Sequence, residues 1–218
     1  MAGMLYLVPT PIGNLSDISA RCRKTFEEAD FIAAEDTRVT LKLLNYLEIK
    51  KPLVSYYEHN KLESGPKIVR RIQEGETCVL VSDAGSPAIS DPGEDLVRLC
   101  AEAGLTVCAI PGPCALVTAL SISGLPTGRF CFEGFLSINK KSRQEHLSGL
   151  KNERRTMIFY EAPHKLLATL KDMAATFGED RRVSLCRELT KLHEEVVRTT
   201  LGEAVARYTE NPPRGEFV

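Results

Sequence analysis

Residues 78–93 read CVLVSDAGSPAISDPG, and this stretch decides how the rest of the chain is interpreted. Its first four residues form an apolar run typical of a buried strand, and the segment after it has a helical pattern with an apolar side formed by Leu96, Val97, Leu99 and Cys100. The loop between them, residues 82–93, contains two Gly, two Pro and two Asp. Ligands usually bind at the carboxyl ends of strands in α/β sheets, so we expect this loop to bind one. The alternative is a plain turn in which Asp91 caps a helix that begins at Pro92.

Two other loops have a similar composition and also follow an apolar run. Residues 9–15 (PTPIGNL) follow the run 4–8, and residues 111–113 (PGP) follow the run 106–109. Glycine in such a loop permits positive φ, so the backbone can turn tightly beside a ligand. The chain contains neither G-x-x-x-x-G-K-[ST] nor G-x-G-x-x-G, so these loops do not predict a nucleotide phosphate site. We expect the three loops to share one crevice.

The composition is that of a soluble globular protein, with 43% hydrophobic and 26% charged residues in a chain of 218. The apolar run before Pro9 has only five residues, too few for a signal peptide or a membrane span. The seven Cys include no C-x-x-C pair, which favours reduced core thiols over a disulfide framework or a zinc site. No metal-ligand spacing stands out. We therefore expect a cytoplasmic protein that contacts no membrane and holds no metal.

Apolar runs and helical patterns alternate along the chain, which indicates an α/β fold with mainly parallel strands. Strands are predicted at 4–8, 31–34, 53–55, 78–81, 106–109, 156–160 and 183–187. Helices are predicted at 19–28, 38–47, 62–73, 93–103, 114–123, 140–151, 164–176 and 202–208.

Glycine and proline between residues 124 and 128 interrupt this alternation. We predict an N-terminal α/β lobe over residues 1–126, a linker over 127–137 and a C-terminal α/β lobe over 138–218, with the ligand cleft between the two lobes. Residues 216–218 resemble the start of a strand rather than its end, so we expect the C-terminal lobe to be a shortened form.

The charge is distributed unevenly along the chain. Residues 1–128 carry 12 Lys and Arg against 16 Asp and Glu, whereas residues 129–218 carry 16 against 13. The segment 138–155 has the largest local positive excess, and it lies on a predicted helix. Such an excess attracts phosphates, and Lys140, Lys141 and Arg143 contribute to it. The alternative is an ordinary solvated helix face.

Charged residues also follow two of the predicted strands. Glu35, Asp36 and Arg38 stand where the second strand meets a helix, which Asp36 can cap. Arg187 ends the last long strand, and the eight residues after it include five ionisable side chains. Composition alone does not decide between a catalytic site and an exposed loop at either place.

Eight motifs occur along the chain in this order: LVPTPIGNL (7–15), EDTR (35–38), SDAG (82–85), SDPG (90–93), PGP (111–113), GFL (134–136), YEAPH (160–164) and RELTK (187–191). Together they resemble the motifs of one family, the ribosomal small subunit methyltransferase I proteins of the tetrapyrrole methylase superfamily. Cys114, Ser137, Ala162 and Lys165 depart from the usual family residues.

The resemblance implies S-adenosylmethionine as the methyl donor and the ribose 2′-hydroxyl of a cytidine in small-subunit (16S) ribosomal RNA as the acceptor. It also implies a two-lobed homodimer that acts on this RNA or on the assembled small subunit. The implied cofactor-binding residues are Pro11, Asp83, Ala84, Gly85, Ile89, Ala115, Phe135, Leu136 and Gly215.

Transfer to a hydroxyl benefits from a general base, for which Asp36, Glu188 and a Lys191 with lowered pKa are the candidates. Arg38, Arg187 and Lys191 are equally suited to hold RNA phosphates. With RNA as the implied acceptor, we also predict that RNA contacts the basic segment 138–155 at Lys140, Lys141 and Arg143.

Two other functions stay open at this point. One is a methyltransferase of the same fold that acts on a tetrapyrrole or a protein side chain, although those enzymes usually carry Gly-Asp-Pro where this chain has Ser82-Asp83-Ala84. The other is a non-catalytic RNA-binding module, for which we would expect a basic chain or exposed aromatic platforms. A net charge of −1 and the absence of Trp do not favour it.

Overall fold

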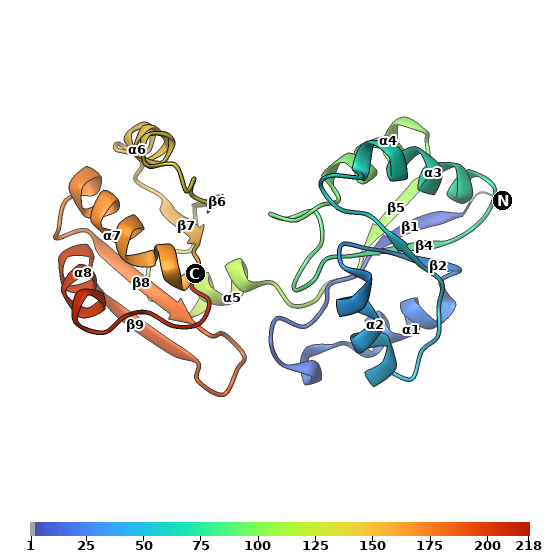
Figure 1. Cartoon of the computed structure of the whole chain (residues 1–218), viewed down its shortest axis with the longest axis horizontal. Helices are drawn as coiled ribbons and strands as arrows, with labels where there is room; N and C mark the ends of the chain where they lie inside the picture. The colour runs from blue at the N-terminus through green and yellow to red at the C-terminus, as the bar shows by residue number, and fades with distance from the viewer. Residues whose placement is uncertain (1–2) are drawn as a thin grey trace. The chain divides into compact units, whose positions relative to one another are not determined.

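The apolar run 78–81 forms the central strand of a five-stranded parallel sheet, as its sequence predicts. This is seen in the computed structural model of the chain, which describes residues 3–218 (Figure 1). The strand order is β3-β2-β4-β1-β5, with bounds β1 (Met4–Leu7), β2 (Phe31–Ala34), β3 (Leu53–Ser55), β4 (Cys78–Val81) and β5 (Thr106–Ala109). The intervening helices are the short 3-10 helix η1 (Leu15–Asp17) and α1 (Ala20–Glu28), α2 (Thr37–Tyr46), α3 (Lys61–Gln73) and α4 (Glu94–Glu102).

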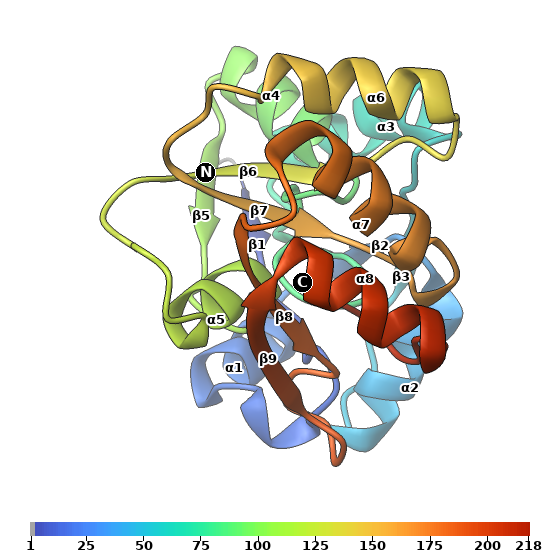
Figure 2. The same cartoon turned by 90° about the vertical axis from the view of Figure 1, so that its left-hand side faces the viewer.

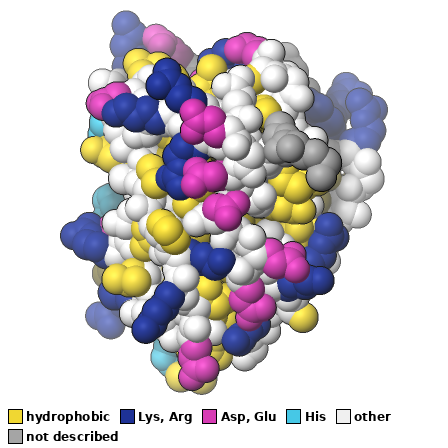
Figure 3. Space-filling model, turned by 90° about the vertical axis from the view of Figure 1, so that its right-hand side faces the viewer, with side chains coloured by type: hydrophobic (Ala, Val, Ile, Leu, Met, Phe, Trp, Pro, Cys, Tyr) yellow, Lys and Arg dark blue, Asp and Glu magenta, His cyan; other side chains and the backbone are white. Residues whose placement is uncertain are grey.

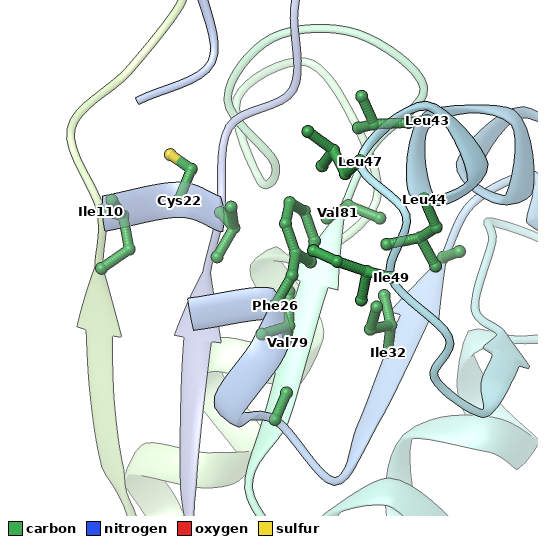
Figure 4. Packing of buried hydrophobic residues seen from close by; sticks show 13 residues of the cluster. Cys22, Phe26, Ile32, Leu43, Leu44, Leu47, Ile49, Val79, Val81 and Ile110 are labelled. Atoms are coloured by element: carbon green, nitrogen blue, oxygen red, sulfur yellow. The ribbon is translucent and has the colours of Figure 1, made fainter. Parts of the chain in front are cut away.

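This sheet is covered by helices on both faces, which is why its central strand is apolar throughout. Helices α1 and α2 pack on one face, where Phe26 and Leu44 belong to the same buried cluster as the alternate β4 residues Val79 and Val81 (Figure 4). Helices α3 and α4 lie on the other face, in a second buried cluster that includes Leu80 (Figure 1). Parallel strands place all their carboxyl ends at one edge, so the loops that follow β1, β2, β4 and β5 meet there.

The C-terminal unit contains two two-stranded sheets, β6-β7 and β8-β9. Its elements are α5 (Ala115–Ile122), β6 (Phe130–Phe135), α6 (Lys140–Gly149), β7 (Thr156–Tyr160), α7 (Pro163–Phe177), β8 (Arg182–Arg187), β9 (Glu195–Thr200) and α8 (Leu201–Glu210). Strands β6 and β7 are parallel, whereas β8 and β9 are antiparallel. Helices α6, α7 and α8 cover one face of these strands and share a single buried cluster with them (Figure 2).

The end of the chain lies between β7 and β8. Phe217 exchanges backbone hydrogen bonds with Glu161, and Val218 exchanges them with Cys186. These bridges are antiparallel to both neighbours and place residues 216–218 between the two strands. The facing edges of β7 and β8 are also separated by an apolar cavity lined by residues of both strands, of α5 and α7, and by Phe217 and Val218. We call this cavity the strand gap.

The division of the chain differs from the predicted one. The structure separates a unit that ends at Cys114 from a unit that begins at Ala115, whereas the sequence pattern placed the boundary at residue 126. Helix α5 belongs to the C-terminal unit because the backbone N–H of Leu116 donates to the hydroxyl of Tyr160, at 3.0 Å. The predicted linker, residues 127–137, contains strand β6.

Two local features also differ from expectation. Strand β9 was not predicted, because only Val196 and Val197 are apolar in it. Helix α4 begins at Glu94 with Gly93 as its N-cap, so Asp91 does not cap it. Within residues 3–218, no helix has the length and apolar character needed to cross a bilayer.

Candidate active-site loops

The loops after β1, β4 and β5 are fastened to one another in the N-terminal unit. Thr10 and Gly85 exchange backbone hydrogen bonds of 2.9 and 3.0 Å, and the Thr10 hydroxyl donates to the carbonyl of Ser82 at 3.2 Å. The Ser86 hydroxyl donates to the carbonyl of Pro113 at 3.1 Å. The structure therefore brings together the three glycine- and proline-rich loops that the sequence singles out.

The loop after β2 is held to the loop after β4 by carboxylates. Asp83 Oδ1 accepts the backbone N–H of Asp36 at 3.1 Å, and the backbone N–H of Asp83 points to Glu35 Oε2 at 3.4 Å. Asp83 and Ala84 are exposed, whereas Gly85 is buried. Asp83 and Ala84 therefore lie exposed at the edge of the sheet, and hydrogen bonds with the loop after β2 hold Asp83 in place.

Asp36 is engaged by Arg38 in a two-pronged ion pair. Arg38 Nε lies 3.0 Å from Oδ1, and its Nη2 lies 2.6 Å from Oδ2. Asp36 also caps helix α2 by accepting the backbone N–H of Arg38 at 2.8 Å. These hydrogen bonds from Arg38 lower the pKa of Asp36 to about 2. A carboxylate with so low a pKa is a weak general base.

The pKa values of Asp91 and Glu35 are shifted in the opposite direction, upward. Burial, followed by the negative charge of Glu35, raises the pKa of the half-buried Asp91 to about 6. Burial also raises the pKa of Glu35, with the charges of Asp83 and Asp36 adding to the effect. Sequence reasoning treated Asp91 as a helix cap and did not select it as a base. Its environment comes from separate loops, so no local motif marks it.

Strained backbone is concentrated in two of the loops. In the described part of the chain, five residues other than glycine have positive φ, and four of them lie in these loops. Ala88 (67°) and Ser90 (64°) lie in the loop after β4, and Glu188 (51°) and Thr190 (66°) lie in the loop after β8. Such conformations cost free energy and cluster at functional sites, so they support the sequence-based choice of both loops.

In the C-terminal unit an aromatic group joins the ends of β6 and β7 to α5. The ring of Tyr160 makes edge contacts with Phe132 and Phe135, at centroid distances of 4.9 and 5.5 Å. Its hydroxyl accepts the N–H of Leu116, which lies next to Ala115. Phe135 is 55% exposed, whereas Leu136 is buried in the core of the unit and offers a ligand only its backbone.

The loop after β8 is built around Lys191. Its ammonium group lies 2.8 Å from Glu188 Oε1 and 2.7 Å from Glu216 Oε2. Burial acts to lower the pKa of Lys191, but the two carboxylates outweigh it and the pKa is raised. This is the reverse of the lowered pKa expected of a lysine base. The Lys191 hydrogen bond in turn lowers the pKa of Glu188.

Gly215 lies directly against Glu188. Its φ is +83°, and a Cβ atom at this position would lie 2.5 Å from Glu188 Cγ. The backbone N–H of the next residue, Glu216, donates to Glu188 Oε1 at 2.9 Å. The 215–218 segment therefore completes the surroundings of Glu188 and Lys191.

The predicted RNA-binding residues fall into different environments. Lys140 and Lys141 are exposed on α6, but Arg143 is 7% exposed and makes a buried ion pair with Asp172, at 2.7 Å. We therefore withdraw Arg143 from the RNA-binding residues, because its guanidinium group serves to hold α6 to α7. Arg187 is partly buried, and its Nε lies 3.1 Å from Glu195 Oε2.

Comparison with known proteins identifies the family. The model of the family described as "Tetrapyrrole (Corrin/Porphyrin) Methylases" matches residues 4–205. The chain is 54% identical over 215 residues to ribosomal RNA small subunit methyltransferase I of Halalkalibacterium halodurans, covering 99% of this chain and 74% of that protein. It is 52% identical to the protein of the same name from Synechocystis, covering 99% and 77%. This chain belongs to the ribosomal RNA small subunit methyltransferase I family. The expected enzyme class, a methyltransferase, is confirmed.

Solved structures agree at the level of the fold. A diphthine synthase has a TM-score of 0.70 at 14% identity, with coverage of 99% of this chain and 88% of that chain. A Thermus thermophilus uroporphyrin-III C-methyltransferase, "complexed with S-adenyl homocysteine", has a TM-score of 0.64 at 19% identity, with coverage of 99% and 95%. The expected tetrapyrrole methylase fold is confirmed.

The loops of the N-terminal unit fit a cofactor held by main-chain groups, as expected for a methylase of this family. Gly85 has a φ of +84°, and a Cβ there would lie 3.4 Å from Ile12 Cγ2. A Cβ on Gly112 would lie 3.0 Å from Pro9 Cβ. Glycine therefore lets these loops pack closely against one another. Ile89 is 44% exposed beside them and provides apolar surface.

Proposed function

We propose that this chain transfers a methyl group from S-adenosylmethionine to the ribose 2′-hydroxyl of a cytidine in small-subunit ribosomal RNA. The single observation that carries the proposal is the match of about half of all residues, over nearly the whole chain, to ribosomal RNA small subunit methyltransferases I. The interlocked loops around Thr10, Gly85 and Pro113 provide the physical support.

In this proposal the cofactor is held by the loops of the N-terminal unit through Pro11, Asp83, Ala84, Gly85 and Ile89, and by Ala115, Phe135, Leu136 and Gly215 of the C-terminal unit. When bound, S-adenosylmethionine supplies a methyl group on a positively charged sulfur. The chain must place the hydroxyl oxygen in line with that sulfur, and positioning of this kind is worth roughly 7–11 kcal/mol.

The remaining charged residues divide into two roles. Asp36 and Glu188 have lowered pKa values, so we assign them to hold Arg38 and Lys191 rather than to remove the hydroxyl proton. Arg38 is the most exposed of these cations, with 87% of its side chain accessible, and it is suited to hold a phosphate near the site. Arg187 and Lys191 are less exposed and orient the loop after β8.

The proposal includes a homodimer that works in the cytoplasm on ribosomal RNA or on the assembled small subunit. Light scattering of the purified protein tests the dimer directly. A monomer at micromolar concentration contradicts the proposed dimer but does not contradict the proposed reaction.

Ribose methylation of small-subunit RNA tests the reaction. RNA from cells that lack the protein is incubated with the purified chain and S-adenosylmethionine, and mass spectrometry then maps the methylated nucleotides. We expect one cytidine to gain a ribose methyl group. Methylation of a base, of a tetrapyrrole or of a protein instead of the ribose overturns the proposal.

A further inference from the structure

A second group of basic residues lies at the opposite edge of the C-terminal unit from the loops described above. Strands β6 and β7 are parallel, and residues 216–218 run antiparallel to both β7 and β8. Strands β6, β7 and β8 therefore run in the same direction, and the segments that precede them meet at one edge (Figure 2). These segments carry five arginines, which we call the arginine edge: Arg129, Arg154, Arg155, Arg181 and Arg182.

The arginine edge surrounds two adjoining hollows in the surface. Arg129 lines one of them and Arg182 lines the other, while Arg154 and Arg155 line both. The second hollow adjoins the strand gap, with which it shares Phe159 and Met173 among its lining residues. Guanidinium groups from three separate segments thus gather around these hollows.

Three cations of the arginine edge have no acidic partner. Over residues 3–218, no carboxylate lies within 4.0 Å of the guanidinium groups of Arg129, Arg154 or Arg182. Arg155 is paired with Glu153 at 2.6 Å, and Arg181 donates to the backbone carbonyl of that same residue at 3.5 Å. The only other carboxylates in these segments are those of Glu179 and Asp180, so the edge keeps a positive excess.

Three of the other basic residues considered for RNA are compensated by carboxylates, whereas Lys140 and Lys141 on α6 are exposed and only Lys141 has a carboxylate nearby in the described chain, Glu145 at 3.9 Å. Arg38 lies against Asp36, Lys191 lies between two carboxylates, and Arg143 is buried against Asp172. On the face drawn in Figure 3, Lys and Arg side chains are interspersed with Asp and Glu rather than gathered together.

We propose that the arginine edge binds the phosphate backbone of the RNA substrate; this inference rests on the proposed function. Guanidinium groups bind phosphate oxygens through two parallel N–H donors, and an uncompensated cation gains most from doing so. The edge holds the RNA away from the reacting hydroxyl and supplies affinity without reading its sequence.

Charge reversal of the unpaired arginines tests the proposal. The variant Arg129→Glu/Arg154→Glu/Arg182→Glu changes exposed side chains that make no ion pair. The matched control is Arg21→Glu/Lys42→Glu/Arg70→Glu, whose side chains are exposed, unpaired in the described chain and located on α1, α2 and α3. Both variants make the same change in net charge, so any difference in their RNA affinity reflects the position of the substituted residues.

Binding of small-subunit ribosomal RNA is measured by filter retention over a range of KCl concentrations. We expect the edge variant to lose at least tenfold in affinity, and the slope of log K against log salt to fall by about two to three, one for each lost phosphate contact. The control should stay within about twofold to threefold of the wild type. Affinity for S-adenosylhomocysteine, measured by titration calorimetry, should be the same in all three proteins.

The outcomes separate the two proposals. If the wild type methylates the RNA and the edge variant binds RNA as tightly as the control does, the inference that the arginine edge binds RNA is wrong and the proposed function stands. If the wild type neither binds nor methylates small-subunit RNA, the proposed function fails and this inference fails with it. If the edge variant is unfolded by circular dichroism, Arg129→Gln/Arg154→Gln/Arg182→Gln replaces it, with an expected loss of at least fivefold; no loss overturns the inference.

Discussion

At the scale of single residues, Asp91 shows how the loop after β4 stores unfavourable free energy. Its carboxyl group must ionise while partly buried beside Glu35 and Asp83. The local backbone adds positive φ at Ala88 and Ser90. A loop whose purpose was only to connect β4 and α4 would gain nothing from these features. They are understandable if the loop is shaped for a ligand.

The pKa of Asp91 predicts a pH-dependent stability. Between its unfolded value of 3.8 and its folded value of about 6, the unfolded chain releases the proton first, so ionisation lowers the free energy of unfolding as the pH rises. Asp91→Asn should therefore raise Tm above pH 6, and the gain should vanish near pH 4. Water screens this partly exposed group, so we expect about 1 kcal/mol at most, or roughly 2–4 °C.

Calorimetric Tm values of Asp91→Asn and of the wild type between pH 4 and 8 check this prediction. Asp36→Asn is the control with the opposite sign, because the pKa of Asp36 is lowered and its ion pair contributes only when it is charged. A gain for Asp91→Asn that is equal at pH 4 and pH 8 would contradict the assigned cause.

Gly85 permits a second test at the same scale. Its φ of +84° is strained for any other residue, and the β-branched Val adds steric conflict beside Ile12. We expect Gly85→Val to fold and to lose at least tenfold in affinity for S-adenosylhomocysteine in titration calorimetry. Gly104→Val is the matched control, since Gly104 also has positive φ (+68°) but has open space around it. Equal affinities in the two variants would mean that the loop is only a turn.

At the scale of elements, α6 shows why a charged helix is not always a solvated one. Arg143 and Leu147 lie four residues apart on one face of α6, and both are buried. That spacing was visible in the sequence and is the signal that could have excluded Arg143 from the RNA-binding residues. Its partner Asp172 lies on α7, 29 residues away, and no local pattern identifies it.

The buried pair of α6 and α7 leads to a prediction about stability. Arg143→Ala leaves the carboxylate of Asp172 buried without its partner, which should lower the free energy of unfolding by about 3–5 kcal/mol. Lys140→Ala and Lys141→Ala change exposed side chains and should alter it by less than about 0.5 kcal/mol. Urea unfolding followed by circular dichroism checks both values. If all three variants are equally stable, the ion pair does not hold the two helices together.

Element positions were largely predictable because most helices and strands carry strong local patterns. The five strands of the N-terminal sheet were placed within a residue by short apolar runs bounded by turn residues. Strand β9 was not predicted from the sequence because it is a partly exposed antiparallel strand with charged residues at Glu195 and Arg198. The linker was misplaced because β6 follows a Gly- and Pro-rich segment and pairs with β7, a strand that begins 20 residues further on.

The candidate site was predictable in part, for the same reason. Glycine, proline and capping residues are typical of loops, so the positions of the loops after β1, β4, β5 and β8 were predictable from the sequence. The charge state of Lys191 was not, because it depends on Glu216, which pairing of the chain end brings close. Interactions between distant segments set pKa values, and composition does not reveal them.

At the scale of the whole molecule, the two units have separate hydrophobic cores. The N-terminal unit has two clusters around a complete five-stranded sheet, whereas the C-terminal unit has one cluster and a sheet divided by the strand gap. Within residues 3–218, the facing edges of β7 and β8 pair with no strand and form bridges only with the segment that contains Phe217 and Val218. We therefore expect the C-terminal unit to be the less stable one.

Scanning calorimetry of the chain should accordingly show two unfolding transitions, the first from the C-terminal unit. Adding about six residues of alternating Val and Thr after Val218 should fill the strand gap, because residues 216–218 already set the direction and register of a strand between β7 and β8. We expect this addition to raise the lower transition by several degrees and to leave the upper one unchanged. A Gly-Ser addition of equal length is the control and should move neither transition. If the Val-Thr addition also moves neither, the gap between β7 and β8 does not accept a strand, and the lower stability of the C-terminal unit has another cause.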